Sequence, residues 1–170
     1  MKYLLIILFS WSSFLMAQDE TIKIKRTPVE TKKWKSAGIN AGGTTGFGIT
    51  YKVRSNREAI QFTALPIVTA DFSVVSLGAK YEHYIKPIDK YTEMYYYVGN
   101  HTLPFSDDLF NSSTNNDMVL NFGVGLGINY ELEKLVHFNF AVGYGLYDVI
   151  NGLSGAYTGE IGVLLNIVHP

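Results

Sequence analysis

The sequence predicts an all-β fold, and three features of the chain carry that prediction. From Trp34 onward, apolar side chains alternate with small or polar ones, which is the period of a β-strand rather than a helix. Turn residues separate the alternating segments. Within 118–131 the alternation is unbroken, with one wholly apolar face and a second face built mainly from glycine and asparagine. Such a strand exceeds the roughly 5–6 residues usual in globular sheets.

The alternating region divides into eight predicted strands. In chain order they are 34–41, 44–53, 58–70, 73–85, 91–100, 118–131, 135–147 and 155–168. The first two form a hairpin around Gly42-Gly43, a pair typical of a tight turn. In the third strand, Pro66 cannot donate a ladder hydrogen bond, so we expect a bulge or a strand end there.

The connections between these strands fall into two classes. Short turns occur at 55–57, 86–90 and 132–134, where asparagine, proline, aspartate and charged residues gather. Longer connections occur at 101–117, which ends in a run of polar residues, and at 148–154, which contains Asn-Gly. Short and long connections that alternate along the chain are typical of an up-and-down antiparallel barrel. If 34–53 were one bulged strand instead of a hairpin, the barrel would have seven strands.

The first 17 residues have the layout of a secretory signal peptide. Lys2 supplies a positive charge, residues 3–9 an apolar core, and Ala17 a small residue before the cleavage point. The apolar core is shorter than the roughly 20 residues of a membrane-spanning helix. We therefore divide the chain into a signal peptide (1–17), a polar N-terminal arm (18–33) and a barrel domain (34–170). The absence of cysteine excludes disulfides and thiolate metal sites, and favours a bacterial envelope for an exported chain.

Three features favour an apolar face in lipid. Most strands reach the roughly 9–11 residues that a tilted bilayer crossing requires. The opposite face is rich in glycine, which suits a crowded lumen better than a solvated exterior. Tyrosines on the apolar faces could form an interfacial girdle; these are Tyr51, Tyr81, Tyr96, Tyr130, Tyr144 and Tyr157. The alternative is a soluble, lipocalin-like envelope barrel that binds a small apolar ligand inside.

The segments NFGVGLGINYEL (121–132) and FNFAVGYGLYDV (138–149) are similar in style to the small eight-stranded outer-membrane β-barrel proteins. The resemblance extends from about Trp34 to His169 and implies residence in the bacterial outer membrane. It also implies contact with outer-membrane lipid and insertion by the barrel-assembly machinery. Because such barrels have an even strand number and longer outward loops, eight strands are favoured over seven. Both termini then lie on the periplasmic side, with 101–117 and 148–154 outside.

The polar face also carries ionisable side chains that we expect to lie in the lumen. They are Lys80, Glu82, Glu93, Glu131, His137 and Glu160. Because a buried charge must be paired, we predict an ion-paired cluster around Lys80, with Glu93 as its partner. His137 could form half of an acid–base pair with a lumen carboxylate, or could simply be a hydrogen-bonded interior side chain.

No catalytic, cofactor or metal site is predicted. The chain lacks a nucleophile elbow, a phosphate loop, an HExxH motif and metal-ligand spacing, so we expect no enzyme. With 14 basic against 15 acidic side chains, nucleic-acid binding has no support. The expected role is structural or surface-interactive, through the outward loops of a monomer, with an unknown extracellular partner. A further alternative is a loop-borne lipid-modifying enzyme using His101, Ser106, Asp107 and Asp108.

Overall fold

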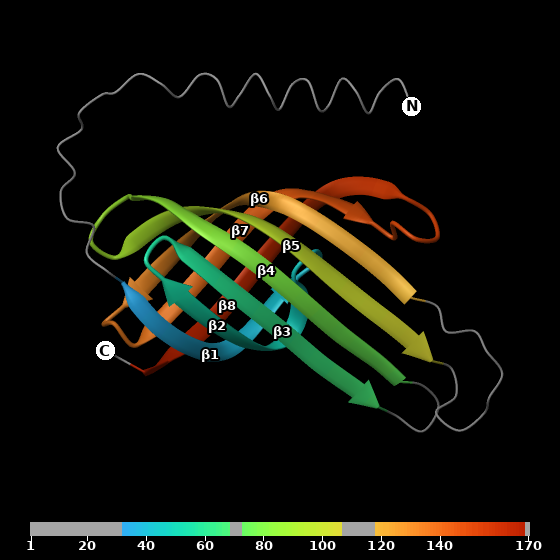
Figure 1. Cartoon of the computed structure of the whole chain (residues 1–170), viewed down its shortest axis with the longest axis horizontal. Coiled ribbons are helices and arrows are strands. Elements are labelled where there is room, and N and C mark those ends of the chain that lie inside the picture. The colour runs from blue at the N-terminus through green and yellow to red at the C-terminus, as the bar shows by residue number, and fades with distance from the viewer. Residues whose placement is uncertain (1–31, 69–72, 107–117, 169–170) are drawn as a thin grey trace, which may run out of the picture.

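A computed structural model of the chain describes residues 32–68, 73–106 and 118–168. These residues form one closed antiparallel barrel of eight strands, each paired with its sequence neighbours and the last with the first (Figure 1). The strands are β1 (Lys33–Gly42), β2 (Gly46–Ser55), β3 (Glu58–Val68), β4 (Ser73–Pro87), β5 (Thr92–Ser106), β6 (Met118–Leu132), β7 (Val136–Tyr147) and β8 (Ser154–Val168). The predicted fold class is confirmed, and 34–53 is a hairpin. The expected signal peptide (1–17) lies outside the described residues.

The predicted strand limits lie within two residues of the observed ones except at the end of β5, and one predicted irregularity is absent. β5 continues to Ser106 instead of ending at Asn100, because its pairing with β6 runs on to Pro104. β3 passes through Pro66 with uninterrupted pairing to β4, so the expected bulge or strand end is wrong. At Pro66, β3 no longer has a β2 partner, since that pairing ends at Ala64. An edge tolerates a residue without an N–H donor.

The two ends of the barrel differ in their connections. The short-turn end, where β1 begins and β8 ends, carries the β2–β3, β4–β5 and β6–β7 turns. There Asp89 accepts hydrogen bonds from the backbone N–H groups of Tyr91 and Thr92, which holds the pKa of its carboxyl below the usual range. The loop end carries the β1–β2 turn and the connections after β3, β5 and β7. None of the described residues forms a helix long and apolar enough to cross a membrane.

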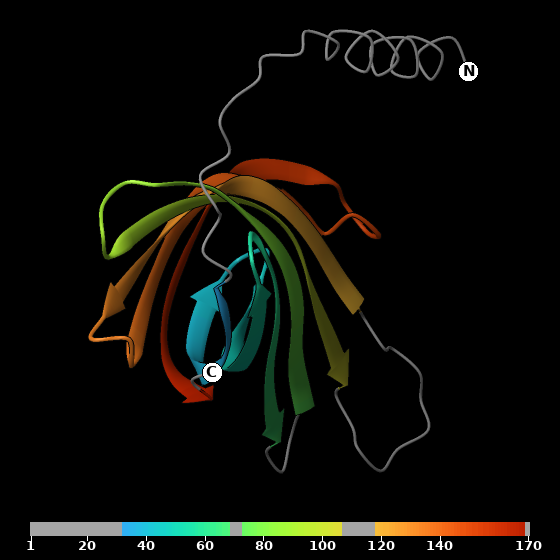
Figure 2. The same cartoon turned by 60° about the vertical axis from the view of Figure 1, so that its left-hand side comes forward.

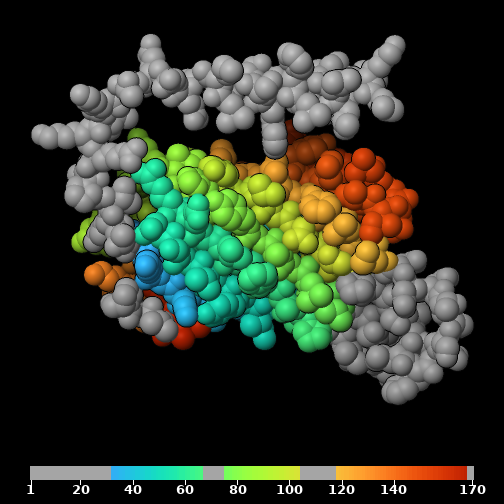
Figure 3. All heavy atoms as spheres, in the orientation of Figure 1, coloured from blue at the N-terminus to red at the C-terminus, as the bar shows by residue number. Residues whose placement is uncertain are grey.

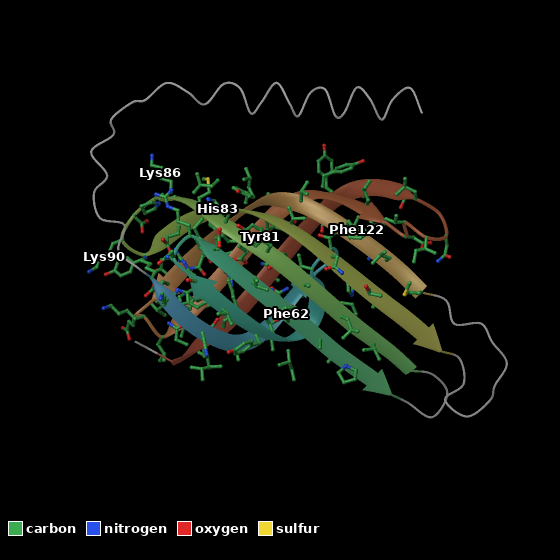
Figure 4. The ribbon with its side chains drawn as sticks, in the orientation of Figure 1. Phe62, Tyr81, His83, Lys86, Lys90 and Phe122 are labelled. Atoms are coloured by element: carbon green, nitrogen blue, oxygen red, sulfur yellow. The ribbon has the colours of Figure 1, made fainter. Side chains whose placement is uncertain are left out.

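The outer surface of the barrel is apolar and its interior is polar. Phe62, Tyr81 and Phe122 present their rings on the outer surface (Figure 4). All six tyrosines assigned to the apolar faces are exposed. Figure 3 shows the same surface covered by side chains over β3, β4 and β5. Most of the buried side chains are polar or charged, so the apolar faces of the strands do not point inward as the lipocalin-like alternative requires.

Candidate functional site in the barrel interior

Four charged side chains form a connected quartet in the middle of the lumen. They are Lys52 from β2, Lys80 and Glu82 from β4, and Glu160 from β8. The Nζ of Lys52 lies 2.5 Å from Oε2 of Glu82, the Nζ of Lys80 lies 2.7 Å from Oε1 of Glu82, and Lys80 also contacts Glu160. The side chains are no more than 1% exposed, and the two positive charges balance the two negative charges.

Polar and aromatic groups complete the surroundings of this quartet. The Tyr84 hydroxyl donates to Oε2 of Glu82 at 2.9 Å, and Lys52 donates to Oδ1 of Asn139 at 3.2 Å. The Tyr95 ring lies between the cations, 5.4 Å from each Nζ. A buried ion pair persists only when such partners compensate its lost hydration. The quartet is therefore a plug in which each charge depends on the others.

A second ion pair closes the short-turn end. Arg54 of β2 makes a bidentate contact with Glu93 of β5, at 2.5 and 3.1 Å, and stacks over the Tyr84 ring at 3.6 Å. The predicted Lys80–Glu93 pair is wrong. Lys80 faces Gly99 across the β4–β5 ladder, whereas Glu93 faces Pro87, much nearer the short-turn end. The register therefore places the two charges at different depths.

His137 belongs to an amide network, not to an acid–base pair. It stacks on Trp34 with ring centroids 4.3 Å apart. Its Nε2 lies 2.9 Å from Oδ1 of Asn166, and its Nδ1 lies 3.3 Å from Nδ2 of Asn129. No carboxylate is among these partners, so of the two expectations for His137 the hydrogen-bonded interior side chain is the one observed. Glu131 faces His137 across the β6–β7 ladder, close to the short-turn end.

The structure thus brings together three of the six predicted lumen residues, Lys80, Glu82 and Glu160. Lys52 and Arg54 were missed as members of the ionic groups, although both alternate with the apolar residues of β2 and so share its inner face. Tyr95 and Tyr97 were also missed as interior residues. The signal that could have identified them is their alternation with Tyr96, which lies on the outer surface.

The glycine face of β6 and β7 is a socket for these inward rings. A Cβ at Gly125 would lie 2.7 Å from Cε1 of Tyr97, and a Cβ at Gly143 would lie 2.9 Å from the Tyr97 hydroxyl oxygen. A Cβ at Gly127 would overlap Tyr95. Real Cβ atoms do not approach other atoms this closely. At Gly125 and Gly143 the backbone of the neighbouring strand is nearer still, so these glycines allow both the close approach of β6 and β7 and the packing of the inward rings.

Nearer the loop end, the β1–β2 turn folds into the lumen. Thr44 and Thr45 at its tip are each only 1% exposed. A Cβ at Gly123 would lie 2.6 Å from Cβ of Thr44, and one at Gly99 would lie 2.8 Å from Cγ2 of Thr45. The turn thus occupies space that glycines on the surrounding strands leave free. It forms a second plug above the ionic quartet.

His101 and Asn121 hold this turn in place. Nδ1 of His101 donates to the carbonyl of Gly43 at 3.1 Å, and Asn121 donates to the same oxygen at 3.3 Å. Nε2 of His101 then accepts from the Ser76 hydroxyl at 3.0 Å. The Ser76 oxygen in turn accepts the N–H of Phe47 at 3.1 Å. We call these side chains and the turn the latch.

The latch corrects the expected place of His101, one of the residues of the hypothesised loop-borne enzyme. His101 lies on β5, faces inward and is 2% exposed, so it is not part of an outer loop. Asp107 and Asp108 lie outside the described residues. Ser76 and His101 have the hydrogen bond of a serine–histidine pair, but Ser76 is fully buried and its oxygen is held by a backbone amide. The pair serves to position the turn. In the described parts of the chain, no three His, Asp or Glu side chains gather in a way that could hold a metal ion.

Next to the latch lies an open pocket of about 570 Å³, which we call the vestibule. Its lining includes His101 and Asn121 of the latch, the rings of Phe47 and Tyr147, and Leu103. The Phe47 ring meets His101 edge-on, with centroids 5.4 Å apart. The interior therefore has a filled, charged half and a half that retains space.

Comparison with solved structures identifies the same architecture. The N-terminal β-barrel domain of Pseudomonas aeruginosa OprF matches with a TM-score of 0.51 and 13% identity, covering 80% of this chain and 100% of that one. Neisserial surface protein A matches at 0.44 and 18% identity, covering 79% and 94%, and Ail of Yersinia pestis at 0.44 and 14%, covering 81% and 99%. No family model and no curated protein matches the sequence. The chain has the closed eight-stranded fold of the small outer-membrane β-barrels.

Proposed function

We propose that this protein is a sealed, non-conducting β-barrel of the bacterial outer membrane with a structural or surface-interaction role. The apolar outer surface and its exposed tyrosines support a location in lipid. Export by the signal peptide at 1–17, insertion by the barrel-assembly machinery and a monomeric state belong to the same proposal. Catalysis has no part in it.

The observation that carries this proposal is the filled lumen. Eight strands enclose only enough room for side chains or one small ligand. Here the ionic quartet fills the middle, and the β1–β2 turn closes the barrel above it. A barrel filled at two levels does not serve as a channel, so its activity resides at its surface.

The β7–β8 loop is the described part of the loop end best suited to contact a partner. Val149, Ile150 and Leu153 are 38%, 52% and 64% exposed. The loop is nevertheless held in one shape, because Asn151 donates to the carboxylate of Asp148 at 2.9 Å and to the Met118 carbonyl at 3.1 Å. An ordered loop that displays apolar side chains fits a partner with an apolar surface. The segment 107–117 lies outside the described residues.

Cysteine labelling tests the location and the orientation. Because the chain has no cysteine, a single introduced thiol gives an unambiguous signal. Gly152→Cys at the loop end should react with a membrane-impermeant maleimide on intact cells. The matched variant Arg57→Cys at the short-turn end should react only after the outer membrane is permeabilised. Equal labelling of both variants, or release of the protein by osmotic shock, would contradict the proposal.

Conductance tests the seal independently. The purified barrel in planar lipid bilayers should give no stepwise currents. Regular single-channel steps from the folded, heat-modifiable form would show that the lumen conducts. The proposal of a sealed barrel would then be wrong, and only the proposed outer-membrane location would stand.

A further inference from the structure

The barrel wall is incomplete near the loop end. Pairing between β2 and β3 stops at Ile49 and Ala64, although β3 continues to Val68. Pairing between β1 and β8 stops at Gly42 and Glu160, although β8 begins at Ser154. The β1–β2 hairpin is therefore shorter than the strands on either side of it, as Figure 2 shows. Above the hairpin, the edges of β3 and β8 face each other without a strand between them.

The vestibule reaches this gap. His101, Leu103, Asn121 and Tyr147 line it from β5, β6 and β7, and the rest of its lining comes from the β1–β2 hairpin and β8, including Ala41 and Gly159. Both of these residues are exposed on the outer side of the wall. A Cβ at Gly159 would meet its first atom, the Ala141 carbonyl oxygen, 3.9 Å away, so the outer side of this residue is uncovered. The cavity therefore opens sideways, through the wall, toward the apolar outer surface.

The lining of the vestibule favours an apolar occupant. The polar atoms of its His101 and Asn121 side chains already bond to the latch or to the backbone of Asp148. The remaining large side chains are Phe47, Leu103 and Tyr147, of which Tyr147 adds one hydroxyl. None of the described residues that line the cavity is charged. The volume lies within the roughly 300–1,000 Å³ of small-molecule sites.

The edges of the gap supply polar groups next to this apolar cavity. β8 is paired only with β7 over Ser154–Gly159, so its other edge carries backbone N–H and C=O groups without a strand partner. Such an edge is costly in hydrocarbon and gains from a polar partner. An apolar chamber beside unpaired backbone donors matches a molecule with a long hydrocarbon chain and a small polar head.

We propose that the vestibule binds the acyl chain of a long-chain fatty acid that enters from the outer leaflet through the gap between β3 and β8. The acyl chain lies against Phe47, Leu103 and Tyr147, and the carboxylate stays at the gap. The inference deepens the proposed function, since it rests on the membrane location and assigns a ligand class to the loop end.

Photolabelling tests this inference with a defined probe. The folded barrel is placed in phospholipid nanodiscs that contain a long-chain fatty acid with a diazirine on its chain, and adducts are located by mass spectrometry. Adducts should concentrate on Phe47, Leu103 and Tyr147, and excess unlabelled palmitic acid should reduce them at least fivefold. Adducts spread evenly over the outer surface, or labelling that palmitic acid does not reduce, would overturn the proposal.

A pair of variants tests the sideways route. Ala41→Trp places a bulky ring at the gap and should lower vestibule labelling at least fivefold. Ile39→Trp adds a ring on the same face of the same strand, away from the cavity, and should leave labelling unchanged. Heat-modifiable migration confirms that each variant is folded. Equal labelling in both variants would overturn the lateral entry, while the cysteine-labelling result would still decide the membrane location separately.

Discussion

The two halves of the barrel interior solve the burial of polar groups in opposite ways. Toward the short-turn end, charged side chains pair with one another, as Arg54 does with Glu93 and Lys80 with Glu82 and Glu160. Toward the loop end, neutral side chains hold a backbone turn, and a cavity remains above it. In the half toward the short-turn end, the charged side chains satisfy one another and leave no room for a ligand. In the half toward the loop end, fewer side chains fill the lumen, so a ligand could bind there.

The largest effect should come from breaking the ionic half. Lys80→Met leaves the buried carboxylates of Glu82 and Glu160 short of a positive charge, so we expect a loss of about 3–5 kcal/mol in the free energy of unfolding. Urea-induced unfolding of the two proteins in lipid vesicles measures this difference in the free energy of unfolding. The control Lys86→Met, on an exposed residue at the short-turn end (Figure 4), should change stability by no more than about 0.5 kcal/mol.

A double variant shows whether the loss of stability in Lys80→Met comes from a buried carboxylate left without a positive partner. Lys80→Met with Glu160→Gln removes one charge of each sign and keeps the Lys52–Glu82 pair. It should recover part of the stability. If the double variant is as unstable as the sum of its single variants, the quartet does not act as a unit.

The next effect concerns the fit between the turn and its glycine socket. Gly123→Ala forces a methyl group against Thr44, and we expect a cost of about 1–3 kcal/mol from overpacking. Gly159→Ala adds the same methyl group in open space and should be nearly neutral. Adding Thr44→Gly to the first variant should restore stability. Unfolding transitions of the three variants make the comparison, and equal stabilities for Gly123→Ala and Gly159→Ala would show that the turn does not fill the socket.

A smaller effect is expected from releasing the latch. His101→Ala removes the hydrogen bonds to Gly43 and Ser76, at about 1 kcal/mol each. The turn should then become accessible, so that Thr44→Cys reacts with maleimide in the His101→Ala background but not in the wild-type background. His83→Ala is the matched control, because His83 stacks on Tyr96 away from the latch. Identical reaction rates in both backgrounds would show that His101 does not restrain the turn.

The smallest effect should come from the exposed β4–β5 turn. Asp89 accepts backbone hydrogen bonds in its ionised form, which lowers its pKa below 3.8. A lowered pKa stabilises the folded state at neutral pH, and this contribution disappears as the pH falls through the folded-state value. Asp89→Ala should therefore lower the melting temperature slightly at pH 7 and not at all in strong acid. A difference that grows toward acid would contradict this sign.

Much of this architecture follows from local pattern. The alternation in 118–131 predicts a strand, assigns its faces and places Tyr130 outside, because side chains on a pleated strand point alternately to opposite sides. The same rule places Lys80, Glu82 and Glu160 inside. The continuation of β5 beyond Asn100 was harder to detect, since Asn100 and Thr102 interrupt its apolar outer face without ending the strand.

The partners of these residues depend on tertiary structure. Alternation identifies the inner face but not the depth of a residue, which is set by the register between neighbouring strands. For this reason Glu160, distant in sequence, meets Lys80, and Glu93 meets Arg54 instead. The glycines likewise predict a crowded interior, but only the folded barrel shows that Tyr97 and the β1–β2 turn fill it. The sequence by itself determined which side chains share a face of each strand, and it favoured the polar face as the inner one. Only the closure of the eight strands decided which inward groups touch and where space remains, because these depend on contacts between residues far apart in the chain.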